Sequence, residues 1–308
     1  MELKNLISTD QVLSKDFLSK LFNIADQMSD MNKKWETSDI LKWKILASLF
    51  YEPSTRTRFS FESAMLKLGG NVITTENAVK FSSAIKGEIL EDTIKILWWY
   101  TDIIILRHFL KGSAKTASEV SPVPVVNAGD GDGEHPTQAL LDIYTIYKEC
   151  NQIEGLNVAL IGDLKYGRTI HSLIPFLGLF KWVNISLVAP AQLALPDIYK
   201  KYLNDNNISY KEYESIDDIT EETDVFYVTR VQRERFDKME DYESLRNSYV
   251  INNDTLSKMK QDAIIMHPLP RVTEIAVEVD KDPRAAYFRQ AVNGLYIRMA
   301  LLKIILWK

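Results

Sequence analysis

The sequence predicts an α/β protein of two similar-sized domains, each a parallel β-sheet flanked by helices, with helices linking the domains. Its 308 residues exceed the roughly 250 to 300 at which a single hydrophobic core usually divides. Short apolar runs alternate with helical patterns along the whole chain. A polar stretch at 149–155 separates the fourth run from the fifth and predicts the junction between the domains.

Eight runs predict strands, because they are short, rich in β-branched residues and nearly continuously apolar, as in strands buried on both faces of a parallel sheet. They lie at 44–50, 71–74, 102–106, 123–126, 157–161, 184–188, 225–228 and 263–266. We expect one domain at 1–149 and the other at 150–289, with a C-terminal helix in 290–308 (about 293–307) packing back on the first.

Composition excludes several classes of protein. With 37 Lys and Arg against 42 Asp and Glu, the net charge is -5, so no global basic field exists to hold nucleic acid or an anionic membrane. The single cysteine, Cys150, and the four histidines leave little material for a disulfide framework or a metal site. The most apolar windows, 94–106 and 295–307, fall short of the ~20 residues of a bilayer helix. We expect a cytoplasmic protein with no cofactor or metal, which must bind any anionic ligand through a local cluster of cations.

The first motif runs from Glu52 to Glu62 (EPSTRTRFSFE), directly after the first strand. Ser54 can cap a helix whose apolar residues recur until Gly69 and Gly70. The hydroxyls of Ser54, Thr55 and Thr57, with Arg56, therefore stand at a helix N-terminus, where backbone N–H groups and the macrodipole favour an anion. The motif predicts a phosphate cradle; a plain N-cap with surface arginines is the alternative.

The second motif, His135-Pro136-Thr137-Gln138, follows a turn-rich segment. Pro136 suits the first position of a helix, so His135 and Gln138 project from the helix start. This is where open α/β sheets hold their ligands, although a lone histidine there can also be a simple cap.

Three further motifs follow predicted strands of the second half. The segment 162–169 nearly matches a nucleotide-binding loop but carries Arg168 in place of lysine, and it lacks the glycine spacing of a dinucleotide site. An arginine there suits a carboxylate, or else a structural salt bridge. Arg230 and Gln232 repeat that arrangement, and 267–271 (HPLPR) is an extended loop whose prolines can point carbonyl groups toward a ligand. A polar segment at 75–88, with Ser82 and Lys86, is either a functional loop or a solvated one.

These six motifs, in this order, resemble those of the aspartate/ornithine carbamoyltransferase family over about 50–302, and the 267–271 loop is similar to its aspartate branch. The resemblance implies transfer of a carbamoyl group from carbamoyl phosphate to L-aspartate, in pyrimidine biosynthesis. Such an enzyme holds two anionic substrates together with arginine, lysine and helix N-termini.

The resemblance also implies a role for each site residue. The phosphate would be held by Ser54, Thr55, Arg56 and Thr57, and the carbamoyl carbonyl polarised by Thr55, Arg107 and His135. Gln138 and the carbonyls of Pro268 and Leu269 would orient the reacting groups, and Arg168, Arg230 and Gln232 would bind the carboxylates of aspartate. Ser82 and Lys86 would come from the adjacent subunit of a homotrimer, which could bind separate zinc-bearing regulatory chains.

The sequence departs from the family's pattern at three places. Ile85 stands where many relatives have a second lysine, Phe109 where proline is common, and Asp132-Gly133-Glu134 where relatives have neutral amides. The alternatives are a transcarbamoylase for another amine such as ornithine, and a catalytically silent interaction partner. The paired Arg168 and Arg230 argue against a cationic acceptor, since a second guanidinium would repel it.

Overall fold

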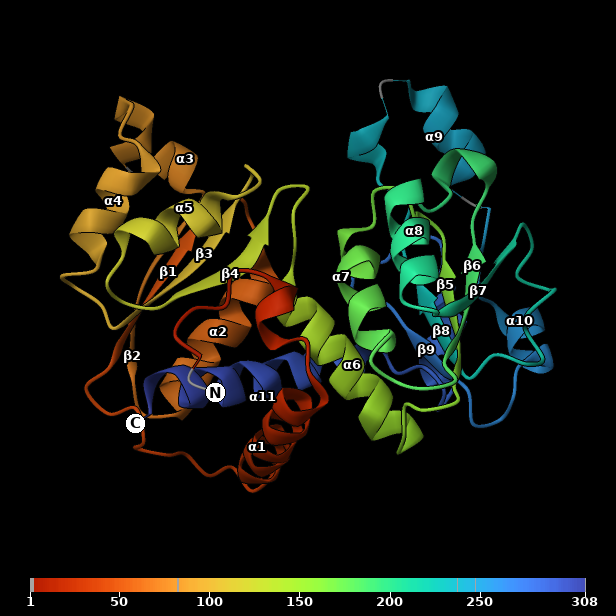
Figure 1. Cartoon of the computed structure of the whole chain (residues 1–308), viewed down its shortest axis with the longest axis horizontal. Helices are drawn as coiled ribbons and strands as arrows, with labels where there is room; N and C mark the ends of the chain where they lie inside the picture. The colour runs from red at the N-terminus through yellow and green to blue at the C-terminus, as the bar shows by residue number, and fades with distance from the viewer. Residues whose placement is uncertain (1–2, 82, 237, 247, 308) are drawn as a thin grey trace. The chain divides into compact units, whose positions relative to one another are not determined.

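The computed structural model describes residues 3–81, 83–236, 238–246 and 248–307 (Figure 1). The chain divides into two compact units, Met1–Leu141 with Val292–Lys308 (unit 1) and Asp142–Ala291 (unit 2). Helices α6 (Pro136–Cys150) and α11 (Tyr287–Leu306) each contribute residues to both units. The predicted fold class is confirmed, because each unit is built on an all-parallel sheet with flanking helices.

Unit 1 is built on four parallel strands in the order β2-β1-β3-β4. Side chains of α4 and α5, such as Ile94 and Ala117, pack against Leu49 and Leu106 on one face of this sheet. The strands are β1 (Ile45–Phe50), β2 (Asn71–Glu76), β3 (Ile103–His108) and β4 (Val125–Asp130). The helices are η1 (Thr9–Val12), α1 (Lys15–Lys33), α2 (Thr55–Lys67), α3 (Ala78–Phe81), η2 (Ser83–Lys86), α4 (Leu90–Leu97) and α5 (Ser113–Val120).

Unit 2 is built on five parallel strands in the order β7-β6-β5-β8-β9. Phe226 and Val228 face a core shared with Leu256 of α10, while Tyr227, between them, points to the opposite face. The strands are β5 (Asn157–Ile161), β6 (Asn184–Val188), β7 (Ser209–Tyr213), β8 (Val225–Val228) and β9 (Ile264–Met266). The helices are α7 (Arg168–Leu177), η3 (Ala191–Leu193), α8 (Asp197–Asp205), η4 (Arg233–Arg235), α9 (Met239–Leu245), α10 (Asn253–Lys258) and η5 (Val277–Lys281).

The structure corrects the sequence-based assignment at several element boundaries. Strand β7 was not predicted, because its sequence SYKEY is polar and, as an edge strand, it has no fully buried residue. Strands β2, β3 and β4 run two to four residues beyond their predicted ends, so that Arg107 lies within β3. Helix α11 begins at Tyr287, well before the predicted 293, because burial of Tyr287 anchors its first turn.

Strand direction positions the site residues. In each unit all strands are parallel, so their carboxyl ends, and the loops that follow, meet along one edge of the sheet. Along the described stretches of the chain, no helix is long and apolar enough to cross a membrane.

Candidate functional site

In unit 1, the first motif forms the turn from β1 into α2. Ser54 occupies the N-cap position with extended backbone (φ -158°, ψ 93°), but its hydroxyl makes no capping hydrogen bond. Thr55 and Arg56 are exposed in the first turn, and Thr57 is buried. The backbone N–H groups of a first helical turn have no acceptor within the helix. Ser54 therefore lies at the N-cap as predicted, but its hydroxyl does not bond to the helix and is left to other partners.

The two arginines of this turn have different surroundings. Arg58 lies 3.1 Å from Glu76 and 4.0 Å from Glu62, so its charge is neutralised by carboxylates of the same unit. Arg56 has no ion-pair partner among the described residues. Desolvation by its surroundings lowers the pKa of Arg56 from its usual value, although a guanidinium remains charged at neutral pH. An unneutralised cation at a helix N-terminus favours a phosphate group as its ligand.

Arg107 ends β3 beside this turn. It is buried, and its guanidinium lies 2.9 Å from a carboxylate oxygen of Glu52 and donates to the carbonyl of Ala128 at 3.2 Å. These contacts join Glu52, in the loop after β1, to the carboxyl-terminal halves of β3 and β4. A buried arginine held at the carboxyl edge of the sheet can donate to the oxygen of a polarised carbonyl.

His135 and Gln138 stand at the start of α6, as predicted from Pro136. His135 is buried, and its carbonyl accepts the N–H groups of Gln138 (3.0 Å) and Ala139 (3.2 Å). The unusual acidic residue Glu134 has a structural role. Its carboxylate accepts hydrogen bonds from the hydroxyl of Ser8 (2.9 Å) and from the N–H and hydroxyl of Thr9 (both 2.7 Å), which fastens the N-terminal segment.

The polar segment 75–88 meets the first motif through Glu76, which pairs with Arg58. Lys86 is exposed at the end of η2, and Ile85 beside it is also exposed. Ser82 lies outside the described residues. Phe109 stacks on the ring of His108, with 4.4 Å between the ring centroids.

In unit 2, buried Asp163 joins the loops after β5 and β8. Its carboxylate accepts the N–H of Tyr166 at 2.9 Å and lies 3.4 Å from both nitrogens of Gln232. Burial raises the pKa of Asp163, an effect that the N–H groups of Tyr166 and Gln232 oppose. The side chain of Gln232 also donates to the carbonyl of Tyr166 at 3.0 Å. The predicted residues Arg168, the first residue of α7, and Gln232 thus lie on loops that Asp163 holds together.

A second buried pair shapes the loop 267–271 after β9. The N–H of Leu269 donates to Nδ1 of His267 at 2.8 Å, which leaves the proton on Nε2, 2.8 Å from Oε1 of Glu274. Burial lowers the pKa of His267, so the ring is neutral at neutral pH. Burial also acts to raise the pKa of Glu274, but the hydrogen bond from His267 and neighbouring N–H groups lower it below its ordinary value. Arg271 pairs with Asp280 and stabilises the far end of the loop.

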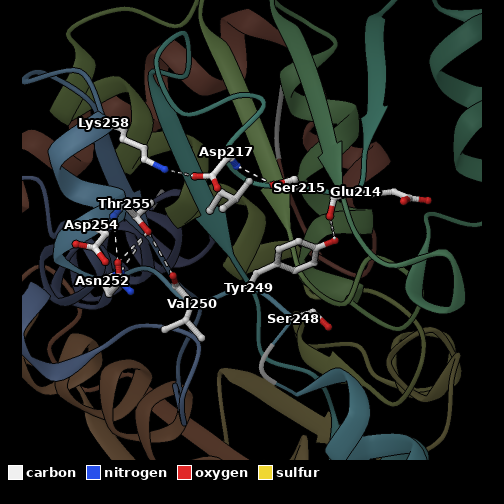
Figure 2. Close-up of a pocket in the computed structure, with 11 residues that line it drawn as sticks. Glu214, Ser215, Asp217, Ser248, Tyr249, Val250, Asn252, Asp254, Thr255 and Lys258 are labelled. Atoms are coloured by element: carbon white, nitrogen blue, oxygen red, sulfur yellow. Dashed lines mark hydrogen bonds and ion pairs between the residues drawn. The ribbon is translucent and has the colours of Figure 1, made fainter.

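A polar pocket of about 380 Å³ lies elsewhere in unit 2, around Tyr249 (Figure 2). Tyr249 donates to the carbonyl of Glu214 at 2.9 Å, and Lys258 pairs with Asp217 at 2.7 Å. None of the predicted site residues lines this pocket. Within the described parts of the chain, no cluster of three or more His, Cys, Asp or Glu side chains could hold a metal ion.

Sequence reasoning missed the residues that support the site: Glu52, Asp163 and Glu274. Glu52 and Asp163 stand inside the motifs 52–62 and 162–169, and their signal was an acidic residue in the same motif as an arginine assigned to an anion. Glu274 is three residues beyond Arg271, and no sequence pattern connects it with His267.

Comparisons with known proteins agree with this arrangement. Residues 4–148 match the carbamoyl-P binding domain of the family "Aspartate/ornithine carbamoyltransferase", and residues 154–305 match the family's Asp/Orn binding domain. The chain is 52% identical over 310 residues to the chloroplastic aspartate carbamoyltransferase of Arabidopsis thaliana, covering 99% of this chain and 80% of that one.

Solved structures are similar along nearly the whole chain. The catalytic subunit of the M. jannaschii aspartate transcarbamoylase aligns with a TM-score of 0.92 at 47% identity, covering 98% of each chain. The Trypanosoma cruzi aspartate transcarbamoylase, solved in complex with carbamoyl phosphate and aspartate, aligns with a TM-score of 0.90 at 38% identity. That alignment covers 98% of this chain and 97% of the other.

Proposed function

The chain belongs to the aspartate/ornithine carbamoyltransferase family, and we propose that the residues described above carry out its reaction. The chain transfers the carbamoyl group of carbamoyl phosphate to the amine of L-aspartate, giving N-carbamoyl-L-aspartate and phosphate, a step of pyrimidine biosynthesis. Similarity over nearly the full length to aspartate carbamoyltransferases, one of them solved with both substrates, supports this activity.

The observation that carries the site assignment is the turn from β1 into α2. Arg56 in this turn has no ion-pair partner in the described structure. Beside it lie the first-turn N–H groups of α2 and the hydroxyl of Ser54, which makes no capping hydrogen bond. Arg58, two residues later, is engaged by Glu76 and serves the fold. Arg56 therefore binds the phosphate and stabilises the negative charge on the leaving oxygen.

The carbonyl group of the substrate is polarised from the same edge of the sheet. Thr55, Arg107 and His135 donate to its oxygen, so that negative charge developing in the tetrahedral intermediate meets fixed donors. The amine of aspartate attacks the carbonyl carbon, the C–N bond forms, and the C–O bond to phosphate breaks. The proton lost by the amine passes to the departing phosphate, which acts as the base. Proximity and fixed dipoles supply most of the acceleration.

The acceptor is held by unit 2. Arg168, Arg230 and Gln232 bind the two carboxylates of aspartate, and the carbonyls of Pro268 and Leu269, with Gln138, orient the amine and the carbamoyl amide. Two cationic groups for two carboxylates favour aspartate over ornithine, whose side chain is cationic. Asp163 holds Gln232 beside the segment that leads into α7, because its carboxylate accepts hydrogen bonds from both Gln232 and the N–H of Tyr166.

The active form in this proposal is a cytoplasmic homotrimer in which Lys86 and Ser82 of one subunit complete the site of the next. The exposed side chain of Lys86, at the end of η2, supports a role toward another copy of the chain. Separate zinc-bearing regulatory chains are further candidate partners.

The test measures N-carbamoyl-L-aspartate formation by the purified chain from carbamoyl phosphate, with L-ornithine as the competing acceptor. We expect product from aspartate only. Arg56→Ala should lower kcat by about 10²- to 10³-fold or more, as for loss of a transition-state donor. Arg58→Ala, the matched control, should keep most of the activity. Citrulline from ornithine, or no product from either amine, would overturn the assignment.

Subunit mixing tests the shared site. Mixing Arg56→Ala with Lys86→Ala should restore about a quarter of the parent activity, because random assembly of a cyclic trimer gives that share of sites both intact groups. Arg56→Ala mixed with Arg107→Ala should restore nothing, since both groups come from the same subunit. Equal recovery in the two mixtures, or none in the first, would argue against the shared site.

A further inference from the structure

A buried hydrogen-bond network connects three distant segments of unit 2. Asp142 of α6 is fully buried, and its carboxylate accepts the hydroxyl of Tyr227 in β8 at 2.7 Å and the side-chain amide of Gln290 in α11 at 2.7 Å. Gln290 in turn accepts the backbone N–H of His267 at 2.8 Å.

This network reaches a loop whose carbonyl groups are assigned to the substrates. His267 begins the loop 267–271, and its Nδ1 accepts the N–H of Leu269 at 2.8 Å. Leu269 has a left-handed backbone (φ 52°), a conformation that is strained for a non-glycine residue and persists only where the surroundings impose it.

The donors and acceptors of the network are complementary in only one arrangement. Burial, followed by the negative charge of Asp142, raises the pKa of Tyr227 well above its ordinary value, so the phenol keeps its proton and donates. The amide of Gln290 donates through Nε2 to Asp142 and accepts through Oε1 from His267. Because an unmatched polar group inside a protein is costly, each member fixes the orientation of the next.

We propose that Asp142, with Tyr227 and Gln290, is a positioning residue for the acceptor substrate: the network sets the placement of the loop 267–271, and thereby the affinity for L-aspartate. The proposal rests on the proposed function, because it assigns the network to the aspartate half of that site. Asp142 itself touches neither substrate.

The first test is the kinetic behaviour of Tyr227→Phe and Asp142→Asn in the full chain. Asp142→Asn replaces one of the two acceptor oxygens by an NH2 group, which then faces either Nε2 of Gln290 or the hydroxyl of Tyr227, so one of these two donors loses its acceptor. We expect KM for L-aspartate to rise about tenfold or more in both variants, since small misplacements of binding groups have large effects. KM for carbamoyl phosphate should rise less than KM for aspartate, because the residues that hold its phosphate belong to unit 1 and only its amide is assigned to the loop 267–271.

A charge-swapped double variant tests the network directly. In Asp142→Asn with Gln290→Glu, the amide of residue 142 can donate to the new carboxylate and accept from Tyr227, while that carboxylate still accepts from His267. All partners are satisfied and the charge is kept, so KM for aspartate should return toward the parent value. Gln290→Glu alone sets two carboxylates against each other and should behave like the other single variants.

Thr223→Val is the control for general destabilisation. Thr223 is as buried as the network, in the same unit, and its hydroxyl donates to the carbonyl of Ile219 at 2.7 Å. The Tm of Thr223→Val should fall by about as much as that of Tyr227→Phe, while its KM for aspartate should not change. Lower stability of Tyr227→Phe with an unchanged KM for aspartate, or no recovery in a folded double variant, would overturn the proposal. A parent chain inactive with aspartate would instead refute the proposed function.

Discussion

Three exposed tryptophans adopt backbone angles that tryptophan rarely adopts. Trp35, Trp43 and Trp182 have φ values of 57°, 71° and 60°. Trp35 follows the last residues of α1, where the N–H of Trp35 donates to the carbonyl of Asn32 and the N–H of Glu36 to that of Met31. This is the Schellman arrangement, in which glycine is the usual residue at the left-handed position. The Trp35 side chain is 90% exposed, so packing does not offset the strain.

Replacing Trp35 by glycine should therefore stabilise the protein. We expect Trp35→Gly to add about 0.5–1 kcal/mol to the free energy of unfolding, because a residue without a Cβ occupies the left-handed region freely. Differential scanning calorimetry should show a higher Tm. Trp35→Ala is the matched control, since alanine keeps the Cβ and should gain little. Equal stabilisation by both variants would assign the effect to loss of the exposed indole ring.

At the scale of elements, the loop after β5 is built around a close backbone approach. Gly162 has φ of +105°, and a Cβ at this position would lie 2.2 Å from the carbonyl oxygen of Thr229. The N–H of Thr229 donates to the carbonyl of Ile161 at 2.9 Å, and the hydroxyl of Thr229 accepts the N–H of Asp163 at 3.1 Å. The contact holds the ends of β5 and β8 together and so keeps Asp163 beside Gln232.

Gly162→Ala should separate these two strand ends. We expect a loss of about 2–4 kcal/mol of stability, from the left-handed backbone and the steric overlap together, and a higher KM for L-aspartate. Gly155→Ala provides the comparison, because Gly155 also has a positive φ (+77°) but nothing lies within 4 Å of an added Cβ. It should lose only about 1–2 kcal/mol and keep its KM. Similar losses in both variants would show that the contact with Thr229 is unimportant.

What the sequence could predict at this scale depends on how local the signal is. Apolar runs predicted the central strands, and Pro136 predicted the start of α6, because burial and backbone restriction act within a few residues. Strand β7 lacks both signals, since SYKEY is polar and lies at the sheet edge. The network of Asp142, Tyr227 and Gln290 could not be predicted, because its members are 63 or more residues apart and meet only after folding. Motifs supplied the residues proposed to bind substrate, whereas the residues that hold their loops emerged from the structure.

At the scale of the whole molecule, burial of histidine links stability to pH. Burial lowers the pKa values of His108, His171 and His267 below the ordinary value of about 6.5. Below that pH the unfolded chain binds protons that the folded chain does not, so acid favours unfolding. Each histidine contributes at most about 1.4 kcal/mol per pH unit, and the contribution ceases below its folded pKa. The lowered pKa of Glu274 adds a separate loss at pH below its ordinary value, about 4.5.

Thermal stability should therefore be nearly constant between about pH 7 and 8 and should fall progressively as the pH drops below about 6.5. His171 offers the clearest test, because it lies on α7 outside the assigned binding groups and its Nε2 lies 2.8 Å from the carbonyl of Leu164. Glutamine can donate a similar hydrogen bond but does not titrate, so His171→Gln should keep most of the Tm at pH 7.5 and lose less of it at pH 5.5. An identical acid-induced shift in parent and variant would exclude His171 as a source of the linkage and leave it to His108 and His267.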